Sequence, residues 1–217
     1  AVSTLRLVVD AVLFDFGGVI TSSPFDAFAV YETEAGLPPD TIRRLNATNS
    51  DDNAWARLER REVDAAGFVD LFEAEAAALG FQLDAQQVLA ALDGRLRPEM
   101  VEAVRRCADR LATALLTNNI EPMNEEMVSD PIDETEEVIG LFDVIVQSSV
   151  VGCRKPEPRF YEIACEQLGV APSGCVYLAD LGINLKPARA MGMATIKVVD
   201  PADALTELEA LVGFSLS

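Results

Sequence analysis

The 217-residue chain contains no histidine. This absence excludes a Ser-His-Asp triad, a His-Glu-x-x-His zinc site, a phosphohistidine intermediate and any histidine general base. Lysine is scarce too, because Lys155, Lys186 and Lys197 are the only three in the chain. Any chemistry must therefore rely on carboxylates, hydroxyls, thiols, these few lysines, or a metal ion held by oxygen.

Positive charge as a whole is in short supply. The chain has 17 basic residues against 36 acidic ones, which gives a formal net charge of −19. Proteins that bind nucleic acid neutralise backbone phosphates with Lys and Arg, so this balance argues against a nucleic-acid partner. The acidity serves solubility or, alternatively, adaptation to high salt. An anionic substrate would have to be captured by a local positive site against the overall field.

Long apolar runs and paired cysteine motifs are missing as well. No segment reaches the roughly 18 uninterrupted apolar residues of a membrane span, and residues 1–10 show no signal-peptide pattern. Cys107, Cys153, Cys165 and Cys175 have no Cys-x-x-Cys spacing, which favours reduced thiols over a zinc or disulfide site. We therefore expect a cytoplasmic protein, a monomer or homodimer, with no membrane partner.

Five short apolar runs are typical of buried parallel strands, and each ends near polar residues or glycine. They are Ala11–Phe14, Ala112–Leu116, Val144–Gln147, Val176–Ala179 and Ala194–Val198. Helical patterns separate them, at Pro98–Arg110, Arg159–Leu168 and Leu185–Met191. This alternation predicts an α/β fold with a Rossmann-like parallel sheet, whose site lies at the carboxyl ends of the strands.

Residues 21–95 break the alternation, because they contain helical patterns and no good strand. The expected helices are Pro24–Ala35, Asp40–Leu45, Asn53–Arg60, Ala65–Leu79 and Ala85–Leu92. We predict a Rossmann-like core formed by residues 1–20 and 96–217, with residues 21–95 inserted as a helical cap. The acidic stretch Glu121–Glu137 is expected to form a loop or short helix at the same edge of the sheet.

Four chemically capable residues follow four of the predicted strands. Asp15 ends the first, Thr117 the second and Asp180 the fourth, while Lys155 lies in the loop after the third. Because the carboxyl ends of parallel strands meet at one edge, these side chains are expected to converge. Asp180 as a helix cap and Thr117 as a plain strand end are the simpler alternatives.

The convergence has a coherent chemistry. Asp15 and Asp180 can hold Mg²⁺, a hard ion that prefers a few carboxylates, a carbonyl and retained waters. The metal would cancel the repulsion between a carboxylate and a phosphate, so that Asp15 can attack phosphorus and form an aspartyl-phosphate. Thr117 and neighbouring backbone N–H groups can donate to phosphate oxygens, and Lys155 can orient Asp15 and stabilise the transition state.

The four motifs together resemble those of the haloacid dehalogenase superfamily. They are Asp-x-x-Gly-Val from Asp15, Leu-Thr-Asn-Asn from Leu116, Arg-Lys-Pro-x-Pro from Arg154 and Asp-x-Gly-x-Asn-Leu-Lys from Asp180. Within that superfamily the chain looks most like the group that contains the N-terminal phosphatase domain of soluble epoxide hydrolases. Residues 58–63 and 184–189 support this resemblance.

The resemblance implies a Mg²⁺-dependent hydrolase of a small phosphorylated metabolite, with a helical cap that supplies specificity. It implies Asp15 as nucleophile and a metal site made by Asp15, Asp180 and the backbone carbonyl of Gly17. It also implies that Thr117, Asn118 and Lys155 surround the phosphate, with Lys155 contributing to catalysis.

Two positions depart from the family pattern. Family phosphatases carry a second Asp two residues after the nucleophile as general acid and base, and this chain has Gly17 there. Since a positioned general acid contributes roughly 10²–10⁴-fold, we expect slow turnover of alkyl phosphates. Ala179 stands where relatives often have a further Asp, which removes one carboxylate beside the metal site.

Several alternatives stay open. A 2-haloacid dehalogenase would use Asp15 without metal, and a degenerate member would bind a phosphometabolite or a protein. A phosphonatase is disfavoured because residues 21–95 contain no lysine, and the Cys-x₅-Arg spacing of Cys153 and Arg159 is rejected because two prolines interrupt it. Asn184 and Lys186 are expected to be loop or capping residues and not catalysts. In the cap, Trp55, Arg57 and Arg60 either line the substrate pocket or have core or surface roles.

Overall fold

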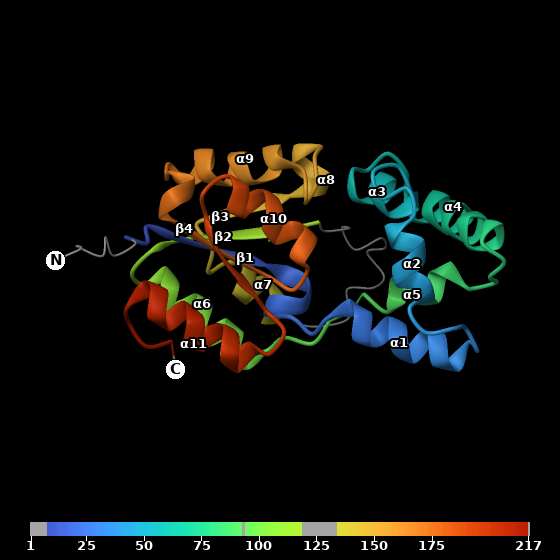
Figure 1. Ribbon diagram of the computed structural model, residues 1–217, viewed down its shortest axis with the longest axis horizontal. Helices are drawn as coiled ribbons and strands as arrows, with labels where there is room; N and C mark the ends of the chain where they lie inside the picture. Colours follow the sequence, from blue (N-terminus) through green and yellow to red (C-terminus); the bar gives the residue numbers. More distant parts are fainter. Residues whose placement is uncertain (1–7, 93, 119–133, 217) are drawn as a thin grey trace.

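The computed structural model describes residues 8–92, 94–118 and 134–216, and it contains one five-stranded parallel sheet. The strands run in the order β3-β2-β1-β4-β5 (Figure 1). Their bounds are β1 Ala11–Asp15, β2 Ala112–Thr117, β3 Val144–Gln147, β4 Cys175–Ala179 and β5 Ala194–Lys197. The predicted α/β class and parallel sheet are confirmed, and each strand lies within one residue of its expected bounds.

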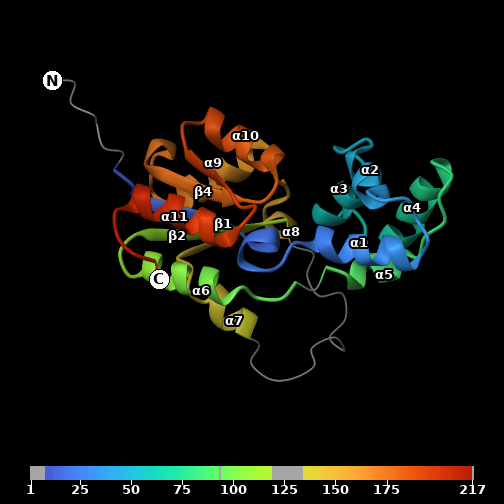
Figure 2. The ribbon, with the colours of Figure 1, turned by 60° about the horizontal axis from the view of Figure 1, so that its bottom comes forward.

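Helices cover both faces of this sheet, which is why the strand sequences are almost continuously apolar. Successive side chains alternate between the faces. On one side Val12 and Phe14 of β1 pack towards α6 (Pro98–Ala108), α7 (Glu134–Ile139) and α11 (Pro201–Val212). On the other side Leu13 packs towards α9 (Pro158–Leu168) and α10 (Gly182–Ala190). Figures 1 and 2 show these two helical layers on opposite sides of the strands.

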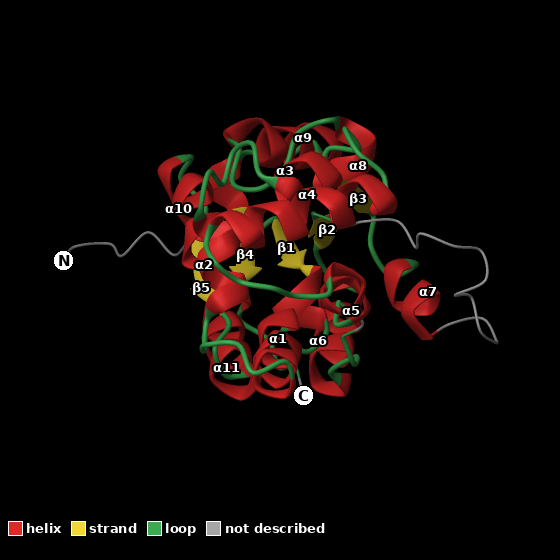
Figure 3. Cartoon of the chain, turned by 90° about the vertical axis from the view of Figure 1, so that its right-hand side faces the viewer, coloured by secondary structure: helices red, strands yellow, loops and turns green. Residues whose placement is uncertain are grey.

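A separate group of helices lies beyond the carboxyl ends of the strands (Figures 1 and 3). It consists of α1 Pro24–Glu34, α2 Thr41–Ala47, α3 Ala54–Glu59, α4 Ala65–Ala78 and α5 Ala85–Ala90. These helices bury their own hydrophobic cluster, in which Trp55 packs against Phe68 with ring centroids 4.7 Å apart and Phe72 stacks on Phe68. The helical group therefore has a core distinct from the two layers on the sheet.

The chain leaves and re-enters the sheet region at one point. Thr21 and Leu96 form an antiparallel bridge. The Ser22 N–H donates to the Arg95 carbonyl at 2.8 Å, and the Arg97 N–H donates to the Ile20 carbonyl at 2.9 Å. The two ends of the helical group are thus held side by side, directly after the turn that follows β1.

Two α-helices of the described residues were not predicted from the sequence. They are α8 (Ser148–Val151), which has four residues, and α11, which begins at Pro201 after the N-cap Asp200. Most of the acidic stretch Glu121–Glu137 lies outside the described residues, and its last four residues belong to α7. Among the described residues, no helix combines the length and the apolarity that crossing a membrane would need.

Candidate active site

Asp15 is the last residue of β1, the central strand of the sheet, and its side chain is almost fully buried. It shares a face of the strand with Leu13, which places its carboxylate on the side covered by α9 and α10. The Phe16 N–H donates to Asp15 Oδ1 at 2.8 Å. The same oxygen accepts a bond from Lys155 Nζ, so the acid and the lysine form an ion pair inside the protein.

Lys155 reaches Asp15 from the loop between α8 and α9, and only 3% of its side chain is exposed. Its ammonium also donates to the carbonyl of Leu116 on β2 at 2.8 Å. Removing two charges from water is costly, and a buried pair of this kind is often no more stabilising than apolar residues of the same size. The pair therefore points to a role in chemistry rather than in folding.

The second oxygen of Asp15 faces two further side chains. Tyr177 Oη on β4 and Asn184 Nδ2 on α10 both lie 3.4 Å from Asp15 Oδ2. Burial first, and then the negative charge of Asp15, raise the pKa of Tyr177 far above its usual value, so this phenol stays a hydrogen-bond donor. Asn184 thus lies inside the site and not in a loop or cap as expected, because the first turn of α10 aims its side chain back at the sheet.

The turn from Phe16 to Ile20 carries the two glycines of the first motif. Gly18 has a φ of +76°, a conformation that favours glycine, and its carbonyl accepts a bond of 2.9 Å from Arg97. A Cβ at Gly18 would overlap the carboxylate of Asp180. Gly17 is different, because its φ is −63° and a Cβ added there would come no closer than 3.8 Å to its nearest neighbour, Pro24 Cδ. Position 17 therefore accepts a side chain.

Asp180 follows β4 and lies against this turn. Burial, and after it the charge of Asp15, raise the pKa of Asp180 to about 6, and Lys155 partly opposes that shift. Ser23 Oγ donates to Asp180 Oδ2 at 3.5 Å. The buried charge of Asp15 beside the partly buried Asp180 is unfavourable for the ionised form of Asp180, and a bound cation would relieve it.

The donor set fits Mg²⁺ better than a metal enclosed by protein ligands. Within the described ranges, no three acidic or thiol side chains gather closely enough to enclose a metal ion. Mg²⁺ usually binds through one or two carboxylates and substrate phosphate oxygens, and keeps several waters. Asp15, Asp180 and the carbonyl of Gly17 are the groups that would hold it here.

Thr117 and Asn118 follow β2, but their side chains have different surroundings. Thr117 is buried at the strand end, one residue beyond Leu116, the partner of Asp15 in the sheet. The Asn118 side chain forms two hydrogen bonds with the Lys155 backbone. Its Nδ2 donates to the Lys155 carbonyl at 3.1 Å, and its Oδ1 accepts from the Lys155 N–H at 2.9 Å. In this arrangement the Asn118 side chain is occupied by the Lys155 backbone, so the Thr117 hydroxyl and backbone N–H groups are the remaining donors that a phosphate could meet at this strand end.

Comparison with known proteins agrees with this arrangement. The model of the haloacid dehalogenase-like hydrolases matches residues 9–192, which is most of the chain. The chain belongs to this family.

Relatives from mouse and from Mycobacterium tuberculosis are similar in sequence to most of the chain. The chain is 34% identical over 212 residues to acyl-CoA dehydrogenase family member 10 of Mus musculus, and 30% identical over 214 residues to bifunctional epoxide hydrolase 2 of the same species. These matches cover 95% and 92% of the chain, but only 19% and 38% of those longer proteins. Phosphatase MT3486 of Mycobacterium tuberculosis (strain CDC 1551 / Oshkosh) is 29% identical, with 85% of each protein covered. The predicted likeness to the epoxide hydrolase group is confirmed.

A solved family member shows the same fold. It is a HAD family enzyme from Bacteroides thetaiotaomicron in complex with magnesium and inorganic phosphate. It superimposes with a TM-score of 0.58 and 17% sequence identity, over 87% of this chain and 93% of that one. At this identity the likeness establishes the haloacid dehalogenase-like fold of the chain and nothing finer.

Two residues at the edge of the family site were not found from the sequence. Glu59, at the end of α3, accepts hydrogen bonds from Arg154 Nε and, at 3.2 Å, from Asn118 Nδ2. Glu59 lies in a segment whose resemblance was noted, and Arg154 lies in the third motif. Nothing in a single sequence shows that a carboxylate of the helical group faces that motif.

The other candidates in the helical group have partners within that group. Trp55 belongs to the core of that group. Arg57 pairs with Asp52, and Arg60 pairs with Glu62, within the same group of helices. Trp55 is thus a core residue, and the guanidinium groups of Arg57 and Arg60 are paired with carboxylates of the helical group.

The Cys-x₅-Arg spacing also has no counterpart in the structure. Arg159 pairs with Glu162 and Glu166 along α9, on the protein surface. Burial raises the pKa of the Cys153 thiol, which disfavours a reactive thiolate. All four cysteines are free, and Lys186 is exposed.

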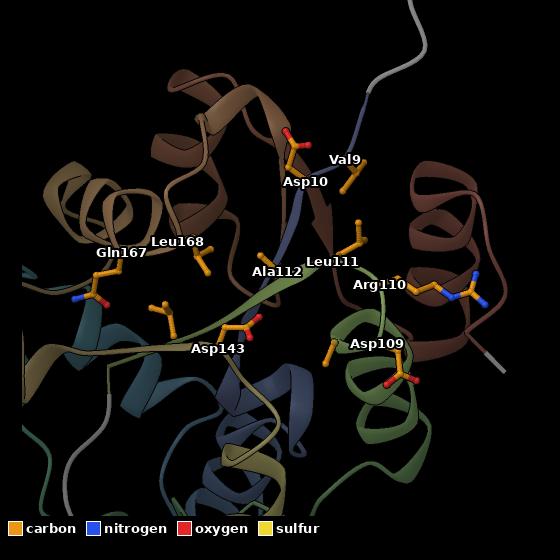
Figure 4. Close-up of a pocket in the computed structure, with 11 residues that line it drawn as sticks. Val9, Asp10, Asp109, Arg110, Leu111, Ala112, Asp143, Gln167 and Leu168 are labelled. Carbon is orange, nitrogen blue, oxygen red and sulfur yellow. The ribbon is translucent and has the colours of Figure 1, made fainter.

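An open cavity of about 720 Å³ lies at the opposite edge of the sheet (Figure 4). It is lined by residues at the amino ends of β1, β2 and β3, including Asp10, Leu111 and Asp143. Asp143 is occupied by the backbone N–H and the hydroxyl of Thr113, at 2.8 and 3.2 Å. Because Asp15 and Asp180 lie at the other ends of the strands, this cavity is unrelated to their chemistry.

Replacing Gly18 with Ala should destabilise the protein. The left-handed backbone alone costs a non-glycine residue about 1–2 kcal/mol, and the methyl group must also displace Asp180. Gly182→Ala is the matched control, since a Cβ there meets nothing within 4 Å. Urea unfolding measures both, and a Gly18→Ala protein as stable as Gly182→Ala would contradict the geometry.

Replacing Asp180 with Asn should stabilise the metal-free protein above pH 6. The folded state raises the pKa of Asp180 from 3.8 to about 6, so its ionised form destabilises the fold and stability is lost as pH rises through this window. In EDTA we expect the free energy of unfolding of Asp180→Asn to exceed that of the wild type by about 3 kcal/mol at pH 7.5 and by little at pH 4. Asp70→Asn, at an exposed position of α4, should show no such dependence; a pH-independent difference for Asp180→Asn would refute the assignment.

Proposed function

We propose that this chain hydrolyses a small phosphate monoester, with Asp15 as the nucleophile and Mg²⁺ as the cofactor. The observation that carries the proposal is the buried ion pair of Asp15 and Lys155 at the carboxyl end of the central strand, with Asp180 beside it. A buried carboxylate that accepts a hydrogen bond from a lysine, next to a second acid, suits an attack on an anionic phosphorus centre.

The relatives support the same reading. Phosphatase MT3486 and sesquiterpene phosphatase astK of Aspergillus oryzae are similar to this chain over most of their own lengths. The solved family member from Bacteroides thetaiotaomicron was captured with magnesium and inorganic phosphate. A metal-independent dehalogenase would make no use of Asp180, so the second carboxylate favours the phosphatase over that alternative.

The reaction proceeds in two transfers. The Asp15 carboxylate attacks phosphorus, the P–O bond to the alcohol breaks, and the leaving oxygen takes a proton from solvent water as it departs. Water then attacks the aspartyl-phosphate, releasing inorganic phosphate and regenerating the carboxylate. Mg²⁺, when bound by Asp15, Asp180 and the Gly17 carbonyl, supplies positive charge that offsets the repulsion between acid and phosphate.

The remaining residues position the reacting groups. Lys155 holds Asp15 through Oδ1 and stabilises negative charge that develops on the transferring phosphoryl group. Tyr177 and Asn184 restrain Oδ2 from the interior side. Because their bonds to Asp15 run through the protein interior, the carboxylate meets its substrate in one orientation, which is the contribution that proximity makes to such reactions.

Residues 21–95 are proposed to act as the cap that selects the substrate. The helices α1–α5 lie past the strand ends that carry Asp15 and Asp180, and they have their own core (Figure 1). Their arrangement can therefore vary without disturbing the sheet. The proton for the leaving group is the weak point of the site, since Gly17 offers no acid.

Phosphate release from p-nitrophenyl phosphate and from sugar and nucleotide phosphates should require Mg²⁺ and stop in EDTA. Asp15→Asn should lower turnover by at least about 10³-fold, because the nucleophile is lost. Asp10→Asn, at the exposed opposite end of the same strand, is the matched control and should retain activity. Turnover by none of the proteins, or equal turnover by all three, would rule out the proposal, and 2-haloacids without metal would be tested next.

Gly17→Asp should accelerate hydrolysis, above all for alkyl phosphates with poor leaving groups. The backbone at position 17 accepts a side chain, and a positioned acid contributes roughly 10²–10⁴-fold. Gly17→Asn has the same shape without the proton and should give no comparable gain. Steady-state rates for p-nitrophenyl phosphate and an alkyl phosphate decide the matter: equal rates for Asp and Asn at position 17 would favour a binding protein over an impaired catalyst.

A further inference from the structure

Glu59 is a buried carboxylate of the helical group that faces the sheet. It is the last residue of α3, and only 14% of its side chain is exposed. Burial raises the pKa of Glu59, and the nearby charge of Arg154 is the largest influence that opposes this shift. A buried carboxylate needs hydrogen-bond donors, and Glu59 accepts from Arg154 and Asn118, which both belong to the part of the chain that carries the sheet.

Arg154 is the first of these partners, and it ties the loop after β3 to two points of the helical group. Its Nε donates to Glu59, and its Nη1 donates to the carbonyl of Ser50 at 2.8 Å, in the segment between α2 and α3. Only 16% of the Arg154 side chain is exposed. The residue directly after it is Lys155.

Asn118 is the second partner, and its orientation depends on Glu59. A carboxylate can only accept hydrogen bonds, so Glu59 fixes the Nδ2 end of the Asn118 amide towards itself. The Oδ1 end is then left to accept the Lys155 N–H, while Nδ2 also reaches the Lys155 carbonyl. With the amide reversed, Oδ1 would meet the Glu59 carboxylate, and two donors would meet at the Lys155 N–H.

We propose that Glu59 is a positioning residue, which orients the Asn118 amide and thereby holds the Lys155 backbone in register with Asp15. A continuous series of contacts runs from Glu59 through Asn118 and Lys155 to Asp15. The inference rests on the proposed function for its catalytic consequence, but its structural part concerns only how Lys155 is held. Since errors of about 1 Å in placing a group can cost about 10²-fold in rate, loss of this restraint should reduce kcat.

The scarcity of lysine makes the structural part directly measurable. With [¹⁵N]lysine, the protein gives backbone amide signals from Lys155, Lys186 and Lys197 alone. In Glu59→Ala we expect the Lys155 signal to shift while the other two stay in place. Glu62→Ala is the matched control, because Glu62 lies three residues away and pairs with Arg60 inside the helical group; all three of its lysine signals should match the wild type.

Glu59→Gln separates orientation from the simple loss of an ion pair. Both partners of residue 59 are donors, so the Gln oxygen can still accept from Asn118, and the Lys155 signal should return close to its wild-type position. Were the ion pair with Arg154 the only role of Glu59, Gln would shift the Lys155 signal as far as Ala does, and that result would overturn the inference.

Activity gives the second readout. With p-nitrophenyl phosphate we expect Glu59→Ala to lower kcat by about 10–100-fold with a much smaller change in KM, and Glu59→Gln to lose less. A Lys155 signal unmoved by Glu59→Ala overturns the inference whatever the rates are. A shifted signal in a protein whose wild type hydrolyses no phosphate ester supports the inference and overturns the proposed function alone.

Discussion

The buried contact between Asp15 and Lys155 is the constraint on which the rest of the site depends. An ammonium removed from water must direct its hydrogen bonds to protein acceptors, and Lys155 directs two of them to the Asp15 carboxylate and the Leu116 carbonyl. This requirement couples three segments, namely the end of β1, the end of β2 and the loop before α9. Asn118 completes the coupling by pairing with both polar groups of the Lys155 backbone.

Electrostatics shape what such a site can bind. Asp15, Asp180 and Glu59 bring three carboxylates to a region in which Lys155 pairs with Asp15 and Arg154 pairs with Glu59. A phosphate would be repelled by these carboxylates and also by the net charge of −19 of the whole chain. A divalent cation held by these carboxylates would change that balance locally, because it would supply two positive charges. The proposed need for Mg²⁺ therefore follows from charge as well as from resemblance.

The sequence predicted the sheet well, because strands buried on both faces leave continuous apolar runs that a single sequence displays. The convergence of Asp15, Thr117, Lys155 and Asp180 followed from topology, since parallel strands end at one edge.

The contacts of individual side chains could not be predicted from the sequence pattern. Asn118 contacts the Lys155 backbone, and Asn184 contacts Asp15, because side-chain direction depends on the local turn of the chain. Glu59 was missed for another reason: its partners lie 59 and 95 residues away in the sequence. The helix α11 packs on the sheet through Ala204 and Leu208. It was missed because its start is marked by the N-cap Asp200 and by Pro201, and the pattern of apolar runs does not include this capping signal.

The bridge between Thr21 and Leu96 makes the formation of the sheet largely independent of the length and shape of the helical insertion. Because both ends of the excursion meet beside β1, its length enters the entropy of closing the sheet only logarithmically. Evolution can then lengthen, shorten or exchange the excursion at small thermodynamic cost to the strands. A helical group of new shape would have to re-establish its own contacts with the Lys155 loop, such as those that Glu59 and Ser50 make with Arg154. Under the proposed function, a change of substrate on this scaffold therefore depends on the contacts between the helical group and the sheet residues, such as those of Glu59 with Arg154 and Asn118.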